Sequence, residues 1–343
     1  MQAIVIKPWK SEGSIDEKLA LVRAAGYETE EIIAVKKDRY PIGSGKLKEI
    51  SEKEPGTIIF LSPLTPSQKR SLHNRTNKEI IDFYDLVLKV FEYHALSREA
   101  KVQIELARLR RDMPYIKKEV SVNVKKEHPG FSGGGEYIIH SHLTNMKKRE
   151  AKLERELQLY EVRKESERKK RRNIVSLAGY TNSGKSTLFN ALSHGRQPTK
   201  NEPFTTLQTK SRKAFLDGRN VVMNDTIGFI SDLPTELIAP FRVTLRDIVE
   251  SDVILLVIDS SESIATIRSK MEVCLSNLRE IGMDRSRSVL ITVLNKIDLL
   301  QEQSVEEVVK GAQIEWPFIA VSALEGLGME ELKKIISSSL PVE

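Results

Sequence analysis

The sequence has a single cysteine, no long apolar run and only a small excess of charge, and each of these shortages excludes a class of protein. Cys274 has no second cysteine to pair with, so an internal disulfide is excluded and a reducing, cytoplasmic location is expected. The longest apolar run, Val253 to Ile258, lies between Asp252 and Asp259 and is far too short to cross a bilayer. Since no signal peptide opens the chain, we expect a soluble protein with no integral membrane segment.

The charges of the chain nearly cancel, with 54 Lys and Arg against 48 Asp and Glu and a formal net charge of +6. Any binding to nucleic acid must therefore come from clustered basic residues and not from the total charge. One such cluster is the run Arg168-Lys169-Lys170-Arg171-Arg172, which fits either a solvated helix end or a contact to phosphate groups. Three histidines, His128, His140 and His142, lack partners at metal-ligand spacing, so no metal centre is expected around them.

The length of 343 residues suits about two domains, and the pattern of the first half divides it further. Residues 1–83 alternate short apolar strands with helices, which predicts a small parallel α/β domain. Inside it, Gly43-Ser44-Gly45-Lys46 has its glycines too close together for a phosphate loop and is expected to be a turn into a helix.

Residues 84–170 are predicted to form a long antiparallel helical hairpin. Apolar residues recur at helical spacing in residues 84–113 and again in residues 143–170, which gives each segment one apolar stripe. The connection over residues 121–142 includes three successive glycines and is predicted to be a long irregular loop. Residues 171–343 are left for a further α/β domain.

That last domain opens with NIVSLAGYTNSGKSTLFN at residues 173–190, which predicts a strand, a glycine loop and a helix in that order. Amides of this P-loop and of the first helical turn are expected to bind phosphate oxygens. Lys185 would place a positive charge near the β- and γ-phosphates, and Ser186 would offer its hydroxyl to Mg²⁺. The residues predicted to contact the nucleotide here are Gly179, Tyr180, Thr181, Asn182, Ser183, Gly184, Lys185, Ser186 and Thr187.

Two further segments are expected to complete the phosphate and metal sites. Thr206, with Thr205 as the alternative, lies at the distance along the chain where a threonine can close over Mg²⁺ and the γ-phosphate. Asp225 ends a predicted strand and is expected to hold Mg²⁺ through water, while Gly228 lets its amide approach the γ-phosphate. The predicted metal ligands are therefore Ser186, Thr206 and Asp225, and the residues expected to act in hydrolysis are Lys185, Thr206 and Gly228.

The base is predicted from Asn295-Lys296-Ile297-Asp298 and from Ser322-Ala323-Leu324, each of which follows a buried strand. Guanine presents two neighbouring donors that one carboxylate can accept together, and Asp298 fits that role. Asn295 would meet the base edge and brace the P-loop, and the Ala323 amide would reach guanine O6. In this order along the chain, the motifs predict a P-loop, Ras-like GTPase domain that binds GTP and GDP.

Phe229 stands where Ras-like GTPases have the glutamine that orients the attacking water. A phenyl ring makes no useful hydrogen bond, so another group must position the water and offset charge. Asn182 raises K⁺ as a second candidate cation beside Mg²⁺, because some GTPases without the glutamine bind K⁺ next to the phosphates through this asparagine.

On these motifs the chain resembles the HflX family of translation-associated GTPases over nearly all of its length. The similar segments are IGSGK at 42–46, LTPSQ at 64–68, NRT at 74–76, REAKVQIELA at 98–107, GYTNSGKSTLFNAL at 179–192 and DTIGFISDLP at 225–234. The resemblance implies a GTPase that binds the large ribosomal subunit, splits or rescues ribosomes, and reaches rRNA with its N-terminal region. We also expect a monomer.

One segment departs from the family. After Gly133-Gly134-Gly135-Glu136 the family continues with acidic residues and arginines, whereas this chain continues YIIHSHLTNMKKR.

Two other functions stay open beside a ribosome-associated GTPase. The first is an RNA-binding or RNA-remodelling protein that uses GTP only as a conformational switch, and the second is a P-loop kinase or ATPase, against which the Asn-Lys-x-Asp motif argues.

Overall fold

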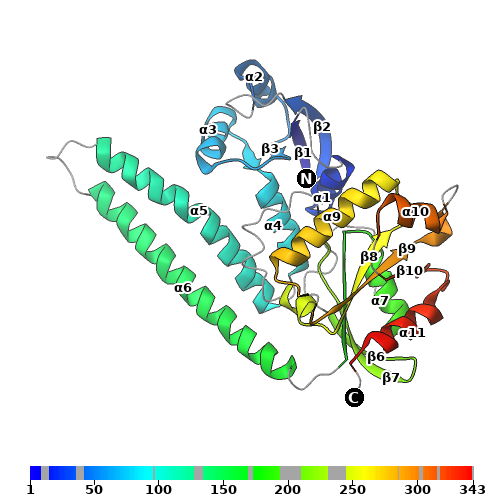
Figure 1. Cartoon of the computed structure of the whole chain (residues 1–343). Coiled ribbons are helices and arrows are strands. Elements are labelled where there is room, and N and C mark those ends of the chain that lie inside the picture. Colours follow the sequence, from blue (N-terminus) through cyan, green and yellow to red (C-terminus); the bar gives the residue numbers. More distant parts are fainter. Residues whose placement is uncertain are drawn as a thin grey trace. The chain divides into compact units, whose positions relative to one another are not determined.

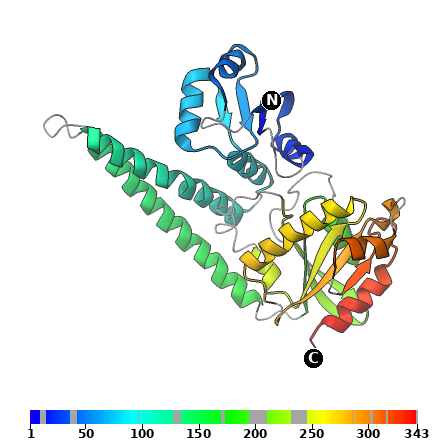
Figure 2. The same cartoon turned by 45° about the horizontal axis from the view of Figure 1, so that its top comes forward.

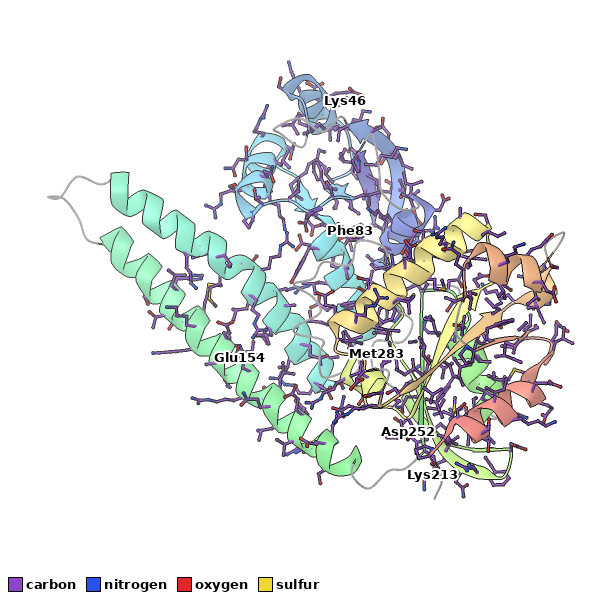
Figure 3. All side chains as sticks on the ribbon, in the orientation of Figure 1. Lys46, Phe83, Glu154, Lys213, Asp252 and Met283 are labelled. Atoms are coloured by element: carbon purple, nitrogen blue, oxygen red, sulfur yellow. The ribbon has the colours of Figure 1, made fainter. Side chains whose placement is uncertain are left out.

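The chain divides into two compact units, Met1–Leu159 and Tyr160–Glu343, each with its own sheet (Figures 1 and 2). The computed structural model describes residues 1–8, 15–35, 42–95, 97–126, 134–168, 173–193, 210–230, 245–284, 286–300, 304–314 and 317–341. Figure 3 adds the described side chains, which are densest around the two sheets.

The first unit is built on a four-stranded parallel sheet with the strand order β2-β1-β3-β4. Its strands are β1 (Gln2–Pro8), β2 (Glu28–Val35), β3 (Thr57–Phe60) and β4 (Glu79–Ile81). The sequence pattern predicts the first three, but β4 has only three residues and offers too short a pattern to recognise. The predicted parallel α/β domain is confirmed.

Four helices cover this sheet: α1 (Ile15–Ala24), α2 (Ser44–Glu52), α3 (Pro66–Thr76) and α4 (Phe83–His94). Helix α1 contacts α4, and α2 contacts α3, so one pair lies on each face. Gly43 is the N-cap of α2, so the chain does turn into a helix here, but the helix begins at Ser44 and Gly45 already lies inside it. Thr65 and Asp82 begin α3 and α4 with capping boxes, in which side chain and backbone satisfy each other's hydrogen bonds.

The predicted first arm of the hairpin is two helices, because α4 ends at His94 and α5 (Arg98–Lys126) begins after a break. Ala95 has extended backbone angles, and the Ser97 hydroxyl then accepts a hydrogen bond from the Ala100 N–H at 3.2 Å, which starts the new helix. Helix α5 continues through Pro114, and α6 (Gly134–Arg168) begins earlier than expected. The predicted loop over residues 121–142 is therefore wrong, since most of that range is helical.

The antiparallel pairing of α5 and α6 is confirmed (Figures 1 and 2). Val102 and Leu106 of α5, and Leu153 and Leu157 of α6, are buried, as the two apolar stripes predict. Ion pairs flank the stripes: Arg98 with Glu156 at 2.8 Å, Arg110 with Glu154 at 2.5 Å, and Arg149 with Glu105 at 2.6 Å. Such half-exposed pairs each contribute little, so the apolar seam supplies most of the hairpin's stability.

The second unit contains a six-stranded sheet with the order β10-β9-β8-β5-β7-β6, in which only the β6 edge is antiparallel to its neighbour. The strands are β5 (Ile174–Gly179), β6 (Lys210–Leu216), β7 (Arg219–Asp225), β8 (Val253–Asp259), β9 (Val289–Asn295) and β10 (Phe318–Ala320). Strand β6 is not predicted by the sequence pattern, because its residues alternate between exposed and partly buried at the start of the strand. The predicted Ras-like class, a mostly parallel sheet after a P-loop, is confirmed.

Helices cover both faces of this sheet as well. They are α7 (Lys185–Ser193), α9 (Ile264–Glu280), α10 (Val305–Gly311) and α11 (Met329–Ser339). Helix α7 packs on β5, β6 and β7, α11 packs on β6, and α9 contacts β5 and β8 and is joined by α10. Across the described helices of both units, none is long and apolar enough to cross a membrane.

A buried charge cluster joins α5 to the start of α4 within the first unit. Asp82 is fully buried, and its carboxylate accepts hydrogen bonds from Arg111 and from the Leu64 N–H at 2.9 Å. Arg111 also donates to Asp85 at 2.7 Å and lies over the Tyr84 ring with 4.4 Å between the guanidinium carbon and the ring centroid. Burial raises the pKa of Asp82, and the repulsion of Asp85 adds to this, while the attraction of Arg111 opposes both.

We expect Arg111→Met to lower the free energy of unfolding of the first unit by about 3–5 kcal/mol, because it leaves the buried Asp82 carboxylate without its cation. Arg108→Met is the matched control, since Arg108 pairs with Glu92 at 2.7 Å on the surface and should cost about 1 kcal/mol or less. Urea unfolding, followed by hydrogen exchange in peptides from β1 and β3, measures both losses. Equal losses in the two variants would show that the buried cluster has no special role.

Candidate nucleotide-binding site

The P-loop lies where the sequence predicts it, between the fully buried strand β5 and helix α7. Gly179 and Gly184 have φ angles of 147° and 90°, which side chains rarely allow. There is also no room for a side chain: a Cβ would lie 2.3 Å from the Val257 carbonyl oxygen at Gly179 and 2.2 Å from Asn295 Nδ2 at Gly184. The loop is therefore packed tightly against β8 and β9. The first amides of α7, which follow the loop, have no partner within the helix and are available to a ligand.

Lys185, the first residue of α7, is buried and points back under the loop. Its ammonium donates a hydrogen bond to the Tyr180 carbonyl oxygen at 2.5 Å. Burial lowers the pKa of Lys185 to about 8, and the attraction of Asp225 offsets only part of this effect. A bound phosphate would supply the negative charge that this cation otherwise lacks.

The predicted metal ligands Ser186 and Asp225 lie side by side. The parallel register pairs Asp225 with Leu177 of β5, and this brings its carboxylate to the start of α7. The Ser186 hydroxyl donates a hydrogen bond to Asp225 Oδ2 at 2.8 Å. The next residue, Thr226, is fixed to β5 because its hydroxyl donates to the Leu177 carbonyl oxygen at 2.5 Å. Thr206 and Thr205, predicted as the third ligand and its alternative, lie outside the described residues.

Phe229 pairs with Tyr180 of the P-loop in a short parallel bridge. The Phe229 N–H donates to the Gly179 carbonyl oxygen at 3.0 Å, and the Thr181 N–H donates to the Phe229 carbonyl oxygen at 2.7 Å. Gly228 lies close enough to Lys185 that a Cβ on it would be 3.0 Å from Nζ. Since the Phe229 side chain is only 1% exposed, it faces the interior and is removed from any attacking water.

These hydrogen bonds occupy backbone groups of Tyr180 and Thr181 that were predicted to contact the nucleotide. The Thr181 N–H is used by the bridge and the Tyr180 carbonyl oxygen by Lys185, so their predicted nucleotide contacts stay predictions. The Tyr180 ring is buried with Lys270 of α9 over it, 4.8 Å from Nζ to the ring centroid. Asn182, by contrast, is exposed and has a left-handed φ of 62°, and the buried hydroxyl of Ser183 has no hydrogen-bond partner among the described residues.

Asn295 joins the predicted base loops to the P-loop. Its side-chain Nδ2 donates to the Ser183 carbonyl oxygen at 2.9 Å, which confirms that it braces the P-loop. Its Oδ1 accepts the Ala323 N–H at 3.1 Å, so that amide is engaged here and its bond to guanine O6 stays a prediction. Neighbouring Ser322 is buried, whereas Leu324 is 76% exposed.

Asp298 lies exposed in a single 3₁₀ turn, Ile297–Leu299, directly after β9. Within the described part of the chain its carboxylate has no hydrogen bond or ion pair, as a group that accepts two base donors requires. Lys296 precedes the turn with a left-handed φ of 68°, and its ammonium is 2.6 Å from Asp259 Oδ2. Asp259 therefore contacts the candidate site, and the motifs do not predict it, although its place directly after the longest apolar run marks a strand end.

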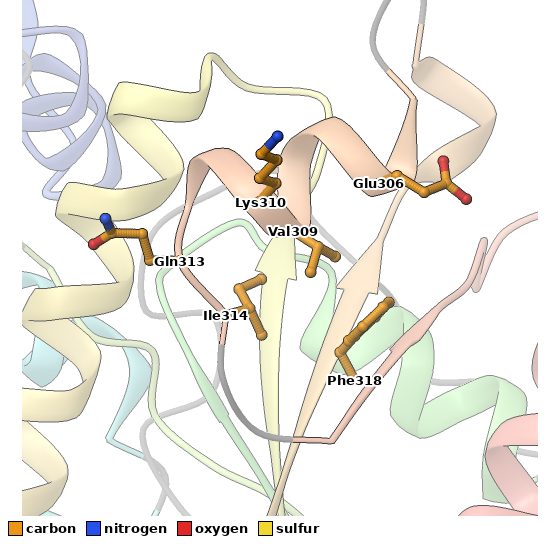
Figure 4. A pocket seen from close by; sticks show the side chains of 6 residues that line it. All are labelled: Glu306, Val309, Lys310, Gln313, Ile314 and Phe318. Atoms are coloured by element: carbon orange, nitrogen blue, oxygen red, sulfur yellow. The ribbon is translucent and has the colours of Figure 1, made fainter.

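Away from these residues, a shallow hollow of about 500 Å³ lies beside α10 and β10 (Figure 4). Its lining includes Val309, Ile314 and Phe318, with Glu306, Lys310 and Gln313 at its margin. None of the predicted nucleotide-binding residues lines it, so the motif residues, not this hollow, define the candidate site.

The lowered pKa of Lys185 predicts that nucleotide binding takes up a proton at mildly alkaline pH. Free Lys185 has a pKa of about 8, whereas bound phosphate favours the charged ammonium and raises the pKa. Affinity for GDP should therefore be level below about pH 7 and fall by up to about tenfold per unit above about pH 8. Calorimetry at about pH 8.5, in buffers of different ionisation enthalpy, measures the uptake. The same protein at about pH 7 is the control, and equal uptake at both pH values would contradict the assignment.

Three family models cover most of the chain in order. "GTP-binding GTPase N-terminal" matches residues 12–92, "GTP-binding GTPase Middle Region" matches 94–171, and "50S ribosome-binding GTPase" matches 174–296. Among solved structures, the chain is similar to a GTP-binding protein from Sulfolobus solfataricus in complex with GDP, with 28% identity, 98% of each chain covered and a TM-score of 0.55. A complex of the protein SsGBP with GDP gives the same identity and coverage and a TM-score of 0.58.

Curated relatives are similar over nearly the whole chain. GTPase HflX of Thermococcus kodakarensis is 40% identical over 326 residues, which are 92% of this chain and 72% of that protein. GTPase HflX of Thermofilum pendens is 37% identical over 344 residues, which are 95% of this chain and 80% of that protein. The P-loop, the free Asp298 carboxylate and these similarities agree, and the chain is a guanine-nucleotide-binding GTPase that belongs to the HflX family.

Proposed function

We propose that this GTPase hydrolyses GTP in association with the large ribosomal subunit, and that it splits or rescues ribosomes. The observation that carries the proposal is the match of residues 174–296 to the family described as a 50S ribosome-binding GTPase. The cytoplasm is the proposed location because ribosomes are there. We propose the three parts that the sequence suggests, an N-terminal domain, a helical hairpin and a G domain, with the boundary at 170/171 kept. The boundary at 83/84 is moved to the end of α4 (Phe83–His94), because that helix packs on β3 and β4 of the first sheet.

We propose Mg²⁺ as the metal of the site. In the described residues no three His, Cys, Asp or Glu side chains gather to hold an ion, so a metal here needs ligands from the nucleotide. The Ser186 hydroxyl would hold Mg²⁺ directly and the Asp225 carboxylate through water, together with phosphate oxygens; the hydroxyl lies 2.8 Å from Asp225 Oδ2. When bound, Mg²⁺ neutralises charge that develops on the β- and γ-phosphates. K⁺ is proposed as a further cation, supported by the exposed Asn182 on its left-handed backbone.

The burial of Phe229 supports a dependence on a partner for hydrolysis. Its side chain is 1% exposed, and its backbone is bonded to Gly179 and Thr181 at the P-loop. Replacing the ring by an amide would place that amide in the apolar interior and not beside the γ-phosphate. The groups that orient water and offset charge must therefore come from the cations, from the residues around Thr206, or from the ribosome.

The hairpin supplies a surface suited to rRNA. Lys148, Lys152 and Arg155 are exposed on α6 at spacings of four and three, so they share one face of the helix. A basic stripe of this kind binds phosphate groups and releases counterions as it does so. RNA binding or remodelling with GTP as a conformational switch alone is the second candidate function, and the same stripe would serve it.

The base assignment predicts a changed preference in Asp298→Asn. The carboxylate is expected to accept two charge-assisted hydrogen bonds from guanine, each worth about 1.5–3 kcal/mol, and the amide of the variant can accept only one of them. Xanthine has a carbonyl in place of the amine, so affinity should shift toward xanthosine diphosphate. Calorimetry with GDP and xanthosine diphosphate measures the shift, and unchanged GDP affinity would contradict the assignment.

The proposed partner predicts slow hydrolysis by the protein alone and rapid hydrolysis on large subunits. Intrinsic turnover should be on the order of 10⁻³ s⁻¹ or below, and bound subunits should raise it by up to roughly 10³–10⁵. Phe229→Gln should not accelerate the isolated protein. Single-turnover hydrolysis with and without purified large subunits tests this. Absence of stimulation, with subunits bound, would leave the RNA-switch function as the better account.

Binding is tested by co-sedimentation with large subunits over a series of salt concentrations. The triple variant Lys148→Ala, Lys152→Ala, Arg155→Ala should bind more weakly and with a smaller slope of log affinity against log salt. Its matched control, Arg279→Ala, Lys310→Ala, Lys334→Ala, removes the same charge from exposed sites in the second unit. If both triples lose affinity equally, the hairpin face is not the contact surface.

A further inference from the structure

The strand β8 ends in a carboxylate, Asp259, that lies beside the base-recognition loop. The parallel register of β8 and β9 places Asp259 opposite Asn295, the first residue of the Asn-Lys-x-Asp motif. The Asp259 side chain is 13% exposed, and that of Lys296 is 24% exposed. The two are therefore held together at the rim of the site, largely shielded from solvent.

Both carboxylate oxygens of Asp259 are occupied. Oδ2 accepts a hydrogen bond from the Lys296 ammonium at 2.6 Å. Oδ1 accepts two from Ser261, one from the backbone N–H at 3.0 Å and one from the hydroxyl at 2.6 Å. The carboxylate cannot rotate without losing a bond, so it offers Lys296 a fixed point of attachment.

Ser260, which lies between Asp259 and Ser261, also bonds the end of β8 to the end of β9. Ser260 donates to the Asn295 carbonyl oxygen from its N–H at 2.9 Å and from its hydroxyl at 2.7 Å. The turn Asp259-Ser260-Ser261 thus binds the end of β9 at two successive residues, by the backbone of Asn295 and by the side chain of Lys296. Lys296 has a left-handed backbone, with φ 68° and ψ 36°. Hydrogen bonds from two neighbouring residues help to hold this less favourable conformation.

The course of the Lys296 side chain shows what this attachment achieves. Its Cε is 3.9 Å from the point where a Cβ on Gly184 would lie, so the methylene chain passes beside the P-loop on its way to Asp259. It starts two residues before Asp298, the predicted acceptor of the guanine donors. The methylene chain therefore presents an apolar surface beside the phosphate loop, and it starts close in sequence to the carboxylate that is predicted to read the base.

We propose that Asp259 is a positioning residue for the guanine base, which acts by holding the Lys296 methylene chain as one wall of the base site. A free lysine side chain would sample many rotamers and would have to be ordered on each binding event, whereas the attached chain is ordered in advance. Asp259 itself touches no nucleotide in this role. The inference rests on guanine-nucleotide binding and is independent of the ribosomal partner.

The test compares GDP with inorganic pyrophosphate, which lacks a base, on the full-length protein. We expect Asp259→Asn to weaken GDP binding about tenfold, because the neutral amide holds the ammonium less firmly, and to change pyrophosphate binding by less than about twofold. Competition against a fluorescent guanine nucleotide measures both, and thermal unfolding verifies that each variant is folded. A loss of the same size for both ligands would mean a general effect on the P-loop and would overturn the proposal.

Two further variants keep the result unambiguous. In a Lys296→Met background, which keeps an apolar chain but no ammonium, Asp259→Asn should cause no additional loss of GDP affinity. A full additional loss there would overturn the proposal. Asp284→Asn is the matched control, because Asp284 Oδ1 accepts the same two bonds from Ser286, at 2.9 and 2.8 Å. It should leave GDP affinity unchanged, and a tenfold loss there would show that breaking any such turn is sufficient.

Discussion

The side-chain amide of Asn295 joins three loops, and the geometry of the nucleotide site depends on it. Its Nδ2 holds the P-loop through the Ser183 carbonyl oxygen at 2.9 Å, and its Oδ1 holds the last base loop through the Ala323 N–H at 3.1 Å. The fit is close enough that no side chain is possible at Gly184, where a Cβ would be 2.2 Å from Nδ2. Because both polar ends of one buried amide are satisfied, any displacement of one loop leaves a buried group without its partner.

Around this bond the site separates into two halves with different chemistry. The phosphate half is charged and buried, with Lys185 under the loop and the Ser186–Asp225 pair at the start of α7. The base half is supported from β8, where Asp259 and Ser260 hold Lys296 and Asn295. Phe229 belongs to neither half, since its ring is in the interior and its backbone extends the P-loop sheet. The residues predicted to bind phosphate and base are thus held in place by the protein itself, while the buried phenylalanine offers no hydrogen bond to an attacking water.

Most of the residues that the structure brings together in the candidate site could be found from the sequence, because local chemistry requires each motif residue. Residue type and spacing identify the glycines of the P-loop, the lysine expected under the phosphates and the carboxylate at a strand end. Asp259 could not be identified in this way. Its proposed role depends on the adjacency of β8 and β9 and on the pairing of Asp259 with Asn295, which no local pattern encodes. The same holds for the buried Arg111–Asp82 pair, whose partners are 29 residues apart on different elements.

The errors in the fold prediction have local causes. Helices α4 and α5 both have helix-forming sequences, and the break at Ala95 depends on backbone angles and on the Ser97 hydroxyl, which composition does not show. Helix α5 passes through Pro114, although proline removes one backbone hydrogen bond and its place in the sequence favours a helix end or a kink. Strand β6 escaped notice because an edge strand that is half exposed lacks a continuous apolar run.

The bond between Asn295 and Ser183 spans 112 residues of chain, and the bond between Asn295 and Ala323 spans another 28. A site assembled from such distant segments forms late during synthesis, since the P-loop is made long before the residue that braces it. A nascent chain that ends before Asn295 has its glycine loop but neither the amide that fixes the loop nor Asp298, the carboxylate predicted to read the base. Nucleotide can therefore stabilise the second unit through the complete site once synthesis has passed Ala323, and until then the growing chain depends on the first unit and on the strands already made.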